Sequence, residues 1–315
     1  MCSIFHYTDT AGLLGILSSE TLFATDYRYL NDVAEAGVIR DLIMPILESE
    51  IAKITPKLIE KGWLNEGFYT ELGTAGHRMQ AESMYRAVVR ATDNVSPIFV
   101  VSFCRHSKGT PAFEHGLLSQ WRGYAASGGF ALEFDEEKLD SLLQHELSQY
   151  AYVMAKSDDV RYHDYNELFD ASVYKGVAGE MIRDLFSDRG IDTSEVTGRK
   201  DIDGVVQKYI TTAPYVKHWG FHEEREYRII APCIRSNSMP EGEKRPAKAI
   251  KFRARSDLMV PYVELFESAN QSFPIKSIIV GPHPYQEKQA EAVRMALESE
   301  YIDATVRLSA IPYRR

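Results

Sequence analysis

The N-terminal segment begins with a short apolar run that ends in His-Tyr-Thr and then changes to helical spacing. Residues 4–8, Ile-Phe-His-Tyr-Thr, predict a short strand, and a second short strand is predicted at 22–25. Between them, leucine and isoleucine recur at the spacing of a helix face, and Asp9 or Thr10 supplies a side-chain oxygen that can cap this helix. The chain is therefore expected to begin as strand, helix, strand.

Helical spacing dominates the next seventy residues. Residues 34–61 have an apolar helix face, and Pro45 and Pro56 are expected to kink or divide this helix. The more polar segment 62–95 is expected to become helical toward its end. The face expected to be buried there consists of Met79, Met84, Ala87 and Val88.

Strands and helices alternate through the rest of the chain. Strands are predicted at 97–104, 128–135, 226–232, 248–254, 275–282 and 303–308. Helices are predicted at 117–125, 136–148 and 286–299, and a mostly helical insertion is expected at about 165–213. There is no internal repeat and no clear linker, so the pattern predicts a single α+β domain over residues 1–315.

Composition narrows the class of protein. With 315 residues and 44% apolar composition, the chain can bury a sizeable core. No apolar run approaches the roughly 18 residues of a membrane helix, and no signal sequence is recognisable, so a cytoplasmic protein without a membrane partner is expected. The widely spaced Cys2, Cys104 and Cys233 predict reduced thiols. Cys104, His106 and His115 match no established metal-site spacing, so no metal is expected.

A net charge of −9 opposes indiscriminate binding to nucleic acid, but one local segment is basic. Six of the twelve residues at 244–255 are Lys or Arg, and none is acidic. A strand there is expected to bury Ile250, Phe252 and Ala254 and to place Lys251, Arg253 and Arg255 together on its other face. That basic face is either a solvated strand surface or a surface that contacts the phosphates of a nucleic acid or nucleotide.

Three predicted strand edges carry residues suited to chemistry, in the order His6, Ser102 and Glu226. A carboxylate such as Glu226 can stabilise a developing positive charge on a sugar. On a continuous strand, Glu224 points to the same face, where it can orient an acceptor. The alternatives are structural: a histidine satisfied within the core, and glutamates paired on a solvated face with Arg225 and Arg228.

Several short motifs together carry a resemblance that spans nearly the whole chain. They are His6-Tyr7-Thr8, Leu30-Asn31-Asp32, Ser102-Phe103-Cys104, Trp121-Arg122-Gly123-Tyr124-Ala125, Phe134-Asp135, and Glu224 through Arg228. In these motifs the chain resembles a widespread bacterial family of unknown function. That family is in turn similar to distant ADP-ribosyltransferases found in toxin and phage-defence modules.

The resemblance implies an ADP-ribosyltransferase-like split β-sheet core with a helical insertion, and NAD as the donor substrate. It implies Glu226 as the catalytic carboxylate, with Glu224 assisting; the alignment also leaves Glu223 open for the catalytic role. The residues implied in contact with NAD are His6, Tyr7, Thr8, Asn31, Ser102, Trp121 and Tyr124.

The function expected from the sequence is a mono-ADP-ribosyltransferase that modifies a macromolecule, as a toxin or phage-defence effector. Lys251, Arg253 and Arg255 slightly favour RNA or DNA over protein as the acceptor. An antitoxin or chaperone partner is consistent with this class. The alternatives are an NAD glycohydrolase, in which water replaces the acceptor, and a catalytically inactive module that binds a nucleotide or a partner.

Overall fold

The computed structural model describes residues 2–30, 35–67, 72–124, 128–163, 205–255, 257–267 and 273–312. The chain forms two compact units. The first unit comprises Met1–Tyr29, Phe99–Val160 and Gly220–Arg315, and the second comprises Leu30–Ile98 and Arg161–Trp219. The fold belongs to the α+β class, with a mixed ten-stranded sheet and, among the described residues, eight α-helices.

The ten-stranded sheet belongs to the first unit. Its strands are β1 (Cys2–Thr8), β2 (Leu22–Asp26), β3 (Ile98–Ser107), β4 (Phe130–Phe134), β5 (Lys156–Asp159), β8 (Glu226–Pro232), β9 (Lys251–Arg255), β10 (Leu258–Leu265), β11 (Ile275–Val280) and β12 (Thr305–Leu308). The main order is β12-β11-β4-β1-β3-β2-β10-β9, and β8 joins β3 to β5. The pair β11–β12 is parallel, whereas β1 is antiparallel to both β3 and β4.

Strand β3 is the centre of the sheet because it has three partners. Its C-terminal half, from Cys104 to Ser107, pairs with β1, and its N-terminal residues Phe99 and Val100 pair with β2. It also pairs with β8. Strands β1, β2 and β8, which are far apart in the sequence, are thereby brought to one strand.

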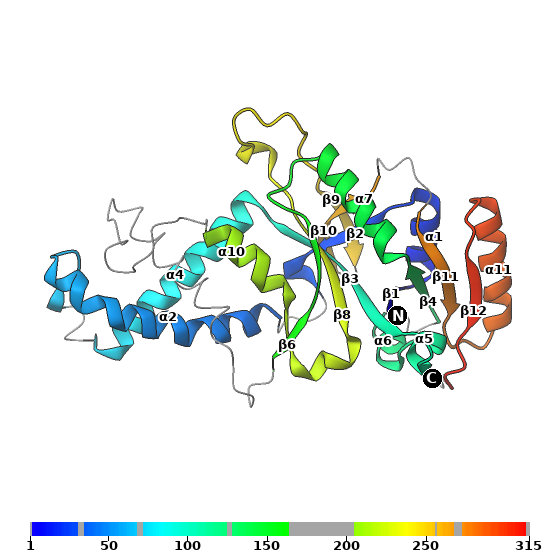
Figure 1. The fold of residues 1–315 in the computed structure, drawn as a ribbon, viewed down its shortest axis with the longest axis horizontal. Helices are drawn as coiled ribbons and strands as arrows, with labels where there is room; N and C mark the ends of the chain where they lie inside the picture. Colours follow the sequence, from blue (N-terminus) through cyan, green and yellow to red (C-terminus); the bar gives the residue numbers. More distant parts are fainter. Residues whose placement is uncertain are drawn as a thin grey trace. The chain divides into compact units, whose positions relative to one another are not determined.

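The two faces of this sheet bury different cores. The main core contains Leu17, Phe103, Leu132 and Val263 and receives apolar residues of three helices, α1 (Thr10–Ser19), α7 (Glu136–Gln149) and α11 (Gln286–Ser299). In Figure 1, α11 runs alongside β12, and the two elements are in contact. The opposite face of β1 and β4 is covered by α5 (Pro111–His115) and α6 (Leu118–Tyr124), which contribute Phe113 and Trp121.

The second unit is built on α2 (Glu35–Glu60), α4 (Thr74–Val95) and α10 (Val205–Thr212), with a parallel strand pair β6 (Arg161–His163) and β7 (Val216–His218). Contrary to expectation, α2 is not divided, although Pro45 and Pro56 lie inside it. Its apolar face, which includes Ile43 and Leu47, is fully buried. That burial outweighs the backbone hydrogen bonds that the prolines remove.

The buried face of α4 also differs from the prediction. Met84 and Val88 are buried, but Met79 is 58% exposed and Ala87 is exposed as well. Tyr85 and Ala81 complete the buried face instead. The buried face of α4 is therefore rotated around the helix axis relative to the predicted face.

The predicted strands at 226–232 and 275–282 and the helix at 286–299 are confirmed within a few residues. Strand β10 was not predicted, and Pro261 within it explains why, since proline argues against a strand interior. Most of the expected insertion at 165–213 lies outside the described residues; α10 is its described part. No helix in the described ranges has the length and apolar character needed to cross a bilayer.

Candidate functional site

A set of polar side chains lies on the face of the sheet opposite the main core. On β2, β3 and β8, residues buried in the main core alternate with polar residues, and alternate residues of a strand point to opposite faces. We call this set the polar face; its members are Thr25, Ser102, Glu226, Arg228 and Arg253. Arg253 belongs to it because Nη2 donates to Thr25 Oγ1 at 2.9 Å.

Glu226 forms a buried salt bridge with Arg228 on the same strand. Arg228 Nε donates to Glu226 Oε1 at 2.7 Å, and Nη2 donates to Oε2 at 2.9 Å. The side chains are 5% and 1% exposed, respectively. Each carboxylate oxygen accepts one of these bonds, so the orientation of Glu226 is fixed. The spacing of two residues on a strand was the sequence signal for this pair. The structural alternative expected such pairing on a solvated face, whereas the pair is buried.

Glu224 does not share the strand face of Glu226. It ends the 3₁₀ helix Trp219–Glu224, and β8 begins only at Glu226. Between them Arg225 has a left-handed backbone with φ 43°. This turn breaks the two-residue alternation, so the expectation of a common face is wrong. Glu223 lies in the same 3₁₀ helix and is exposed.

His6 lies at the point where β1 leaves β3. Its Nδ1 is 2.9 Å from the carbonyl oxygen of Ser102, and because a carbonyl only accepts, Nδ1 carries the proton. Burial lowers the pKa of His6 from its ordinary value, and the positive charge of Arg253 acts in the same direction. The neutral ring therefore presents Nε2 as a hydrogen-bond acceptor. Ser102 contributes its backbone carbonyl to this contact. Its hydroxyl lies on the polar face, on the other side of the sheet from His6.

Tyr7 points away from His6, into the smaller core beneath α6. Its hydroxyl accepts from the backbone N–H of Leu117 at 2.8 Å and lies 2.9 Å from Nε2 of His106. Its ring packs edge-on against Trp121, with centroids 4.9 Å apart. Burial raises the pKa of Tyr7 and lowers the pKa of His106 to about 4. Tyr7 is thus a core residue with satisfied hydrogen bonds, which leaves no ring face for a nicotinamide or adenine.

Trp121 is also a core residue. It is 1% exposed, and its Nε1 donates to the carbonyl of His115 at 3.0 Å. A Cβ atom at Gly116 would lie 2.4 Å from its ring, so the glycine makes room for the indole. The implied contact of Trp121 with NAD therefore does not fit its position.

The other residues that the resemblance implies in contact with NAD lie on different elements. Thr8 ends β1 opposite Phe130 and is half-buried, and Tyr124 at the end of α6 is 42% exposed. Asn31 lies outside the described residues. The described ranges contain no group of three or more His, Cys, Asp or Glu side chains placed to hold a metal ion.

The basic strand β9 differs from its expected pattern. Phe252 is 56% exposed and Ala254 is also exposed, so the expectation that they are buried is wrong. The reason is position: β9 ends the main strand order, at the sheet edge, and the main core does not extend to it. Arg253 and Arg255 are instead the half-buried residues of this strand.

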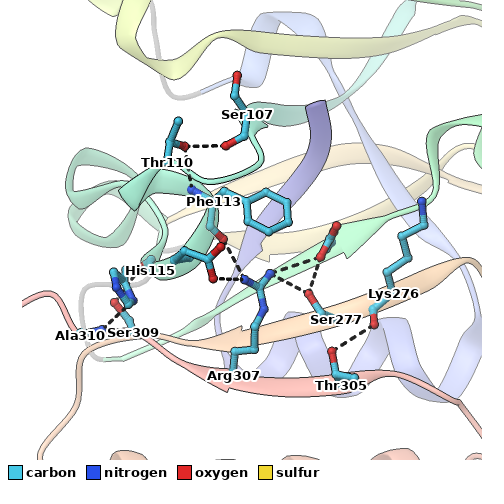
Figure 2. Close-up of polar contacts among 12 residues, drawn as sticks. Ser107, Thr110, Phe113, His115, Lys276, Ser277, Thr305, Arg307, Ser309 and Ala310 are labelled. Carbon is cyan, nitrogen blue, oxygen red and sulfur yellow. Dashed lines mark hydrogen bonds and ion pairs between the residues drawn. The ribbon is translucent and has the colours of Figure 1, made fainter. Parts of the chain in front are cut away.

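A second charged group fastens α5 to the sheet (Figure 2). Arg307 Nη1 donates to the carbonyl of Phe113 at 3.0 Å, and Nη2 donates to Ser277 Oγ at 2.9 Å and to Glu133 Oε2 at 3.2 Å. Ser277 Oγ donates to the same Glu133 oxygen at 2.6 Å. The guanidinium also lies 4.9 Å from the ring centroid of Phe113. The buried carboxylate of Glu133 is therefore fully compensated by protein groups.

Comparison with known proteins finds a match for one segment of this α+β chain. Residues 120–229 match the model of a family described as Protein of unknown function (DUF2971). This segment includes α6, β4 and the Glu226–Arg228 pair but ends before β9. No match was found among curated proteins or among solved structures. A resemblance to a family of unknown function is thus supported over these residues, and none of the comparisons shows a link to ADP-ribosyltransferases.

Proposed function

We propose that the protein is an NAD-dependent mono-ADP-ribosyltransferase that modifies a macromolecule, as a toxin or phage-defence effector. The observation that carries the proposal is that His6, Ser102 and Glu226 lie on the adjoining strands β1, β3 and β8. Ser102 and Glu226 belong to the polar face, whereas His6 faces the main core where β1 leaves β3. A central strand that pairs with β1 along one half and with β2 along the other is consistent with a split-sheet core.

The chemistry of these groups suits a ribose. The neutral Nε2 of His6 is an acceptor for a sugar hydroxyl, and within the described part of the chain it has no hydrogen-bond partner. The carboxylate of Glu226, oriented by Arg228, is the group proposed to accept from the ribose hydroxyl next to the reacting carbon.

In the proposed reaction, the bond between the nicotinamide nitrogen and the ribose C1′ breaks, and nicotinamide leaves with the bonding pair. The ribose becomes oxocarbenium-like, and its positive charge strengthens the hydrogen bond to Glu226 in the transition state. A nucleophilic atom of the acceptor bonds to C1′ and releases a proton. Water in place of the acceptor gives NAD hydrolysis, the alternative outcome of the same site.

The test is incubation of the purified protein with labelled NAD, with and without cellular RNA, DNA and protein. Wild type is expected to transfer label, and Glu226→Gln to lose about a thousandfold in rate. Because this substitution removes the carboxylate that pairs with the buried Arg228, folding needs its own control. The double variant Glu226→Gln with Arg228→Met removes both charges and should regain stability without regaining activity.

Glu224→Gln separates the roles of the two glutamates. Since Glu224 lies outside β8, we expect NAD consumption to remain. Loss of transfer with continued hydrolysis would assign Glu224 to the acceptor. Retained NAD consumption by Glu226→Gln would overturn the assignment of Glu226. A wild type inert toward NAD with every acceptor would favour the inactive binding module.

A further inference from the structure

The three basic side chains of β9 have different partners. Lys251 Nζ donates to Glu264 Oε2 at 2.7 Å, so its charge is neutralised by a carboxylate. Arg255 Nη2 donates to the carbonyl of Tyr29 at 3.0 Å. Arg253 donates only to the hydroxyl of Thr25, and within the described ranges it forms no salt bridge. Unlike Lys251, Arg253 therefore forms no ion pair with a carboxylate of the described residues.

Arg253 is held by two aromatic rings. Its guanidinium carbon lies 5.8 Å from the ring centroids of both Phe23 and Tyr262, and those two rings are 4.4 Å apart. The side chain is half-buried, and its Nε is enclosed without any hydrogen-bond partner. These contacts fix the plane of the guanidinium, so its position is set before any ligand arrives.

Holding a cation in this way is unfavourable in the absence of an anion. Burial lowers the pKa of Arg253, the positive charge of Arg255 lowers it further, and Tyr262 and Asp9 act weakly in the other direction. Two other arginines of this unit have carboxylate partners: Arg228 pairs with Glu226, and Arg105 pairs with Glu136 and Asp159. A desolvated cation without a carboxylate partner is typical of a site that receives its negative charge from a ligand.

We propose that Arg253 binds the diphosphate group of a nucleotide ligand on the polar face. The charge of Arg253 reaches the ring of His6, but His6 pairs with Leu132 and so faces the main core rather than the polar face. The guanidinium fork of Arg253, held in a fixed orientation, matches the oxygens of a diphosphate. This inference rests on the proposed function for the identity of the nucleotide, NAD, and deepens it by naming the residue that holds the donor's diphosphate.

Direct binding tests the proposal without any reaction. Isothermal titration of the protein with ADP-ribose and with inorganic pyrophosphate is compared for wild type, Arg253→Gln and Arg253→Lys. Arg253→Gln should weaken ADP-ribose binding by about 10- to 100-fold, since a charge-assisted pair is lost. Arg253→Lys should fall between, because lysine keeps the charge but not the fork. Lys251→Gln, two residues away and already paired, is the matched control and should bind within about twofold of wild type.

A second measurement uses the unmodified protein and does not depend on how the variants fold. The Nε–H resonance of Arg253, assigned by its absence in Arg253→Lys, should shift when inorganic pyrophosphate is added. No shift, or unchanged ADP-ribose binding by a folded Arg253→Gln, overturns the proposal. So does a loss of affinity confined to an RNA oligonucleotide, which would assign Arg253 to a nucleic-acid backbone.

The outcomes separate this proposal from the proposed function. Arg253-dependent ADP-ribose binding in a protein that never consumes NAD supports the diphosphate site and rejects the transferase. Transfer of ADP-ribose with an unchanged KM for NAD in Arg253→Gln does the reverse.

Discussion

Two regions on the same side of the sheet differ in the partners that they provide for a half-buried arginine. The helix-covered region, defined here by Tyr7, His106, Trp121, Glu133 and Arg307, lies beneath α5 and α6. The polar face lies farther along β3, and the strand takes part in both, since Cys104 and Ser102 are two residues apart. In the helix-covered region each polar group named above bonds to another protein group, whereas on the polar face Arg253 has one hydroxyl partner.

The difference teaches how to separate structural from functional polar residues when both are buried. Burial alone does not distinguish them, because Arg228 is 1% exposed and Glu133 is 6% exposed. Compensation distinguishes two of the arginines: Arg307 donates to the carboxylate of Glu133, whereas the cation of Arg253 lies against aromatic rings. A group that its own protein leaves uncompensated is the better candidate for contact with a ligand.

The largest effect is expected in the helix-covered region. Trp121→Ala should lower the free energy of unfolding by about 3–5 kcal/mol, because a fully buried indole and its hydrogen bond to His115 are lost. Urea unfolding followed by circular dichroism measures this loss. A change of less than about 1 kcal/mol would mean that the helix cover is dispensable, and the contrast between the regions would fail.

A pH dependence of intermediate size is expected from His106. Its pKa of about 4 in the folded protein lies below the usual 6.5 of an unfolded chain, so acid favours unfolding. The contribution is complete above pH 6.5 and is lost as the pH falls toward 4, by about 3 kcal/mol. His6, whose pKa is also lowered, adds to the same trend.

Unfolding in urea at intervals between pH 7 and pH 4 provides the measurement. The variant His106→Gln should show a clearly shallower fall in the free energy of unfolding than wild type. Identical slopes for the two proteins would show that His106 is not held neutral beneath α5 and α6.

The smallest effects come from a matched pair of arginines, one from each region. Arg307→Met should cost about 2 kcal/mol, since the buried Glu133 loses its cation. Arg253→Met should change the free energy of unfolding by no more than about 0.5 kcal/mol in either direction, because the substitution removes a desolvated cation. Equal losses in the two variants would contradict the contrast between compensated and uncompensated charge.

The sequence predicted an element correctly where the evidence for it lay within the segment itself, and less well where burial depends on pairing with distant strands. Strand β8 and helix α11 were correctly placed because alternation and helical spacing are properties of the segment itself. The exposure of Phe252 was not predictable in this way, because it depends on β9 lying at the sheet edge, and that position is set by pairing with β10. The strand propensity of a segment does not indicate whether that strand lies at the edge of a sheet.

Sequence reasoning about the candidate site was limited for a related reason. The sequence singled out His6, Ser102 and Glu226, but it could not tell that Tyr7 and Trp121 pack against each other rather than against a ligand. Both residue types serve cores and binding sites equally well. The role of Thr25 was missed because its contact with Arg253 joins residues 228 positions apart, and nothing in the local sequence marks it.

That long separation has a consequence for when the protein can act. Strand β2 has an early partner in β3, but its other partner, β10, pairs Tyr262 with Thr25 and is made near the end of the chain. A nascent chain shorter than about 265 residues therefore lacks the pairing of β10 with β2 and β9 that brings Arg253 to Thr25. The polar face is completed only after most of the chain has been synthesised.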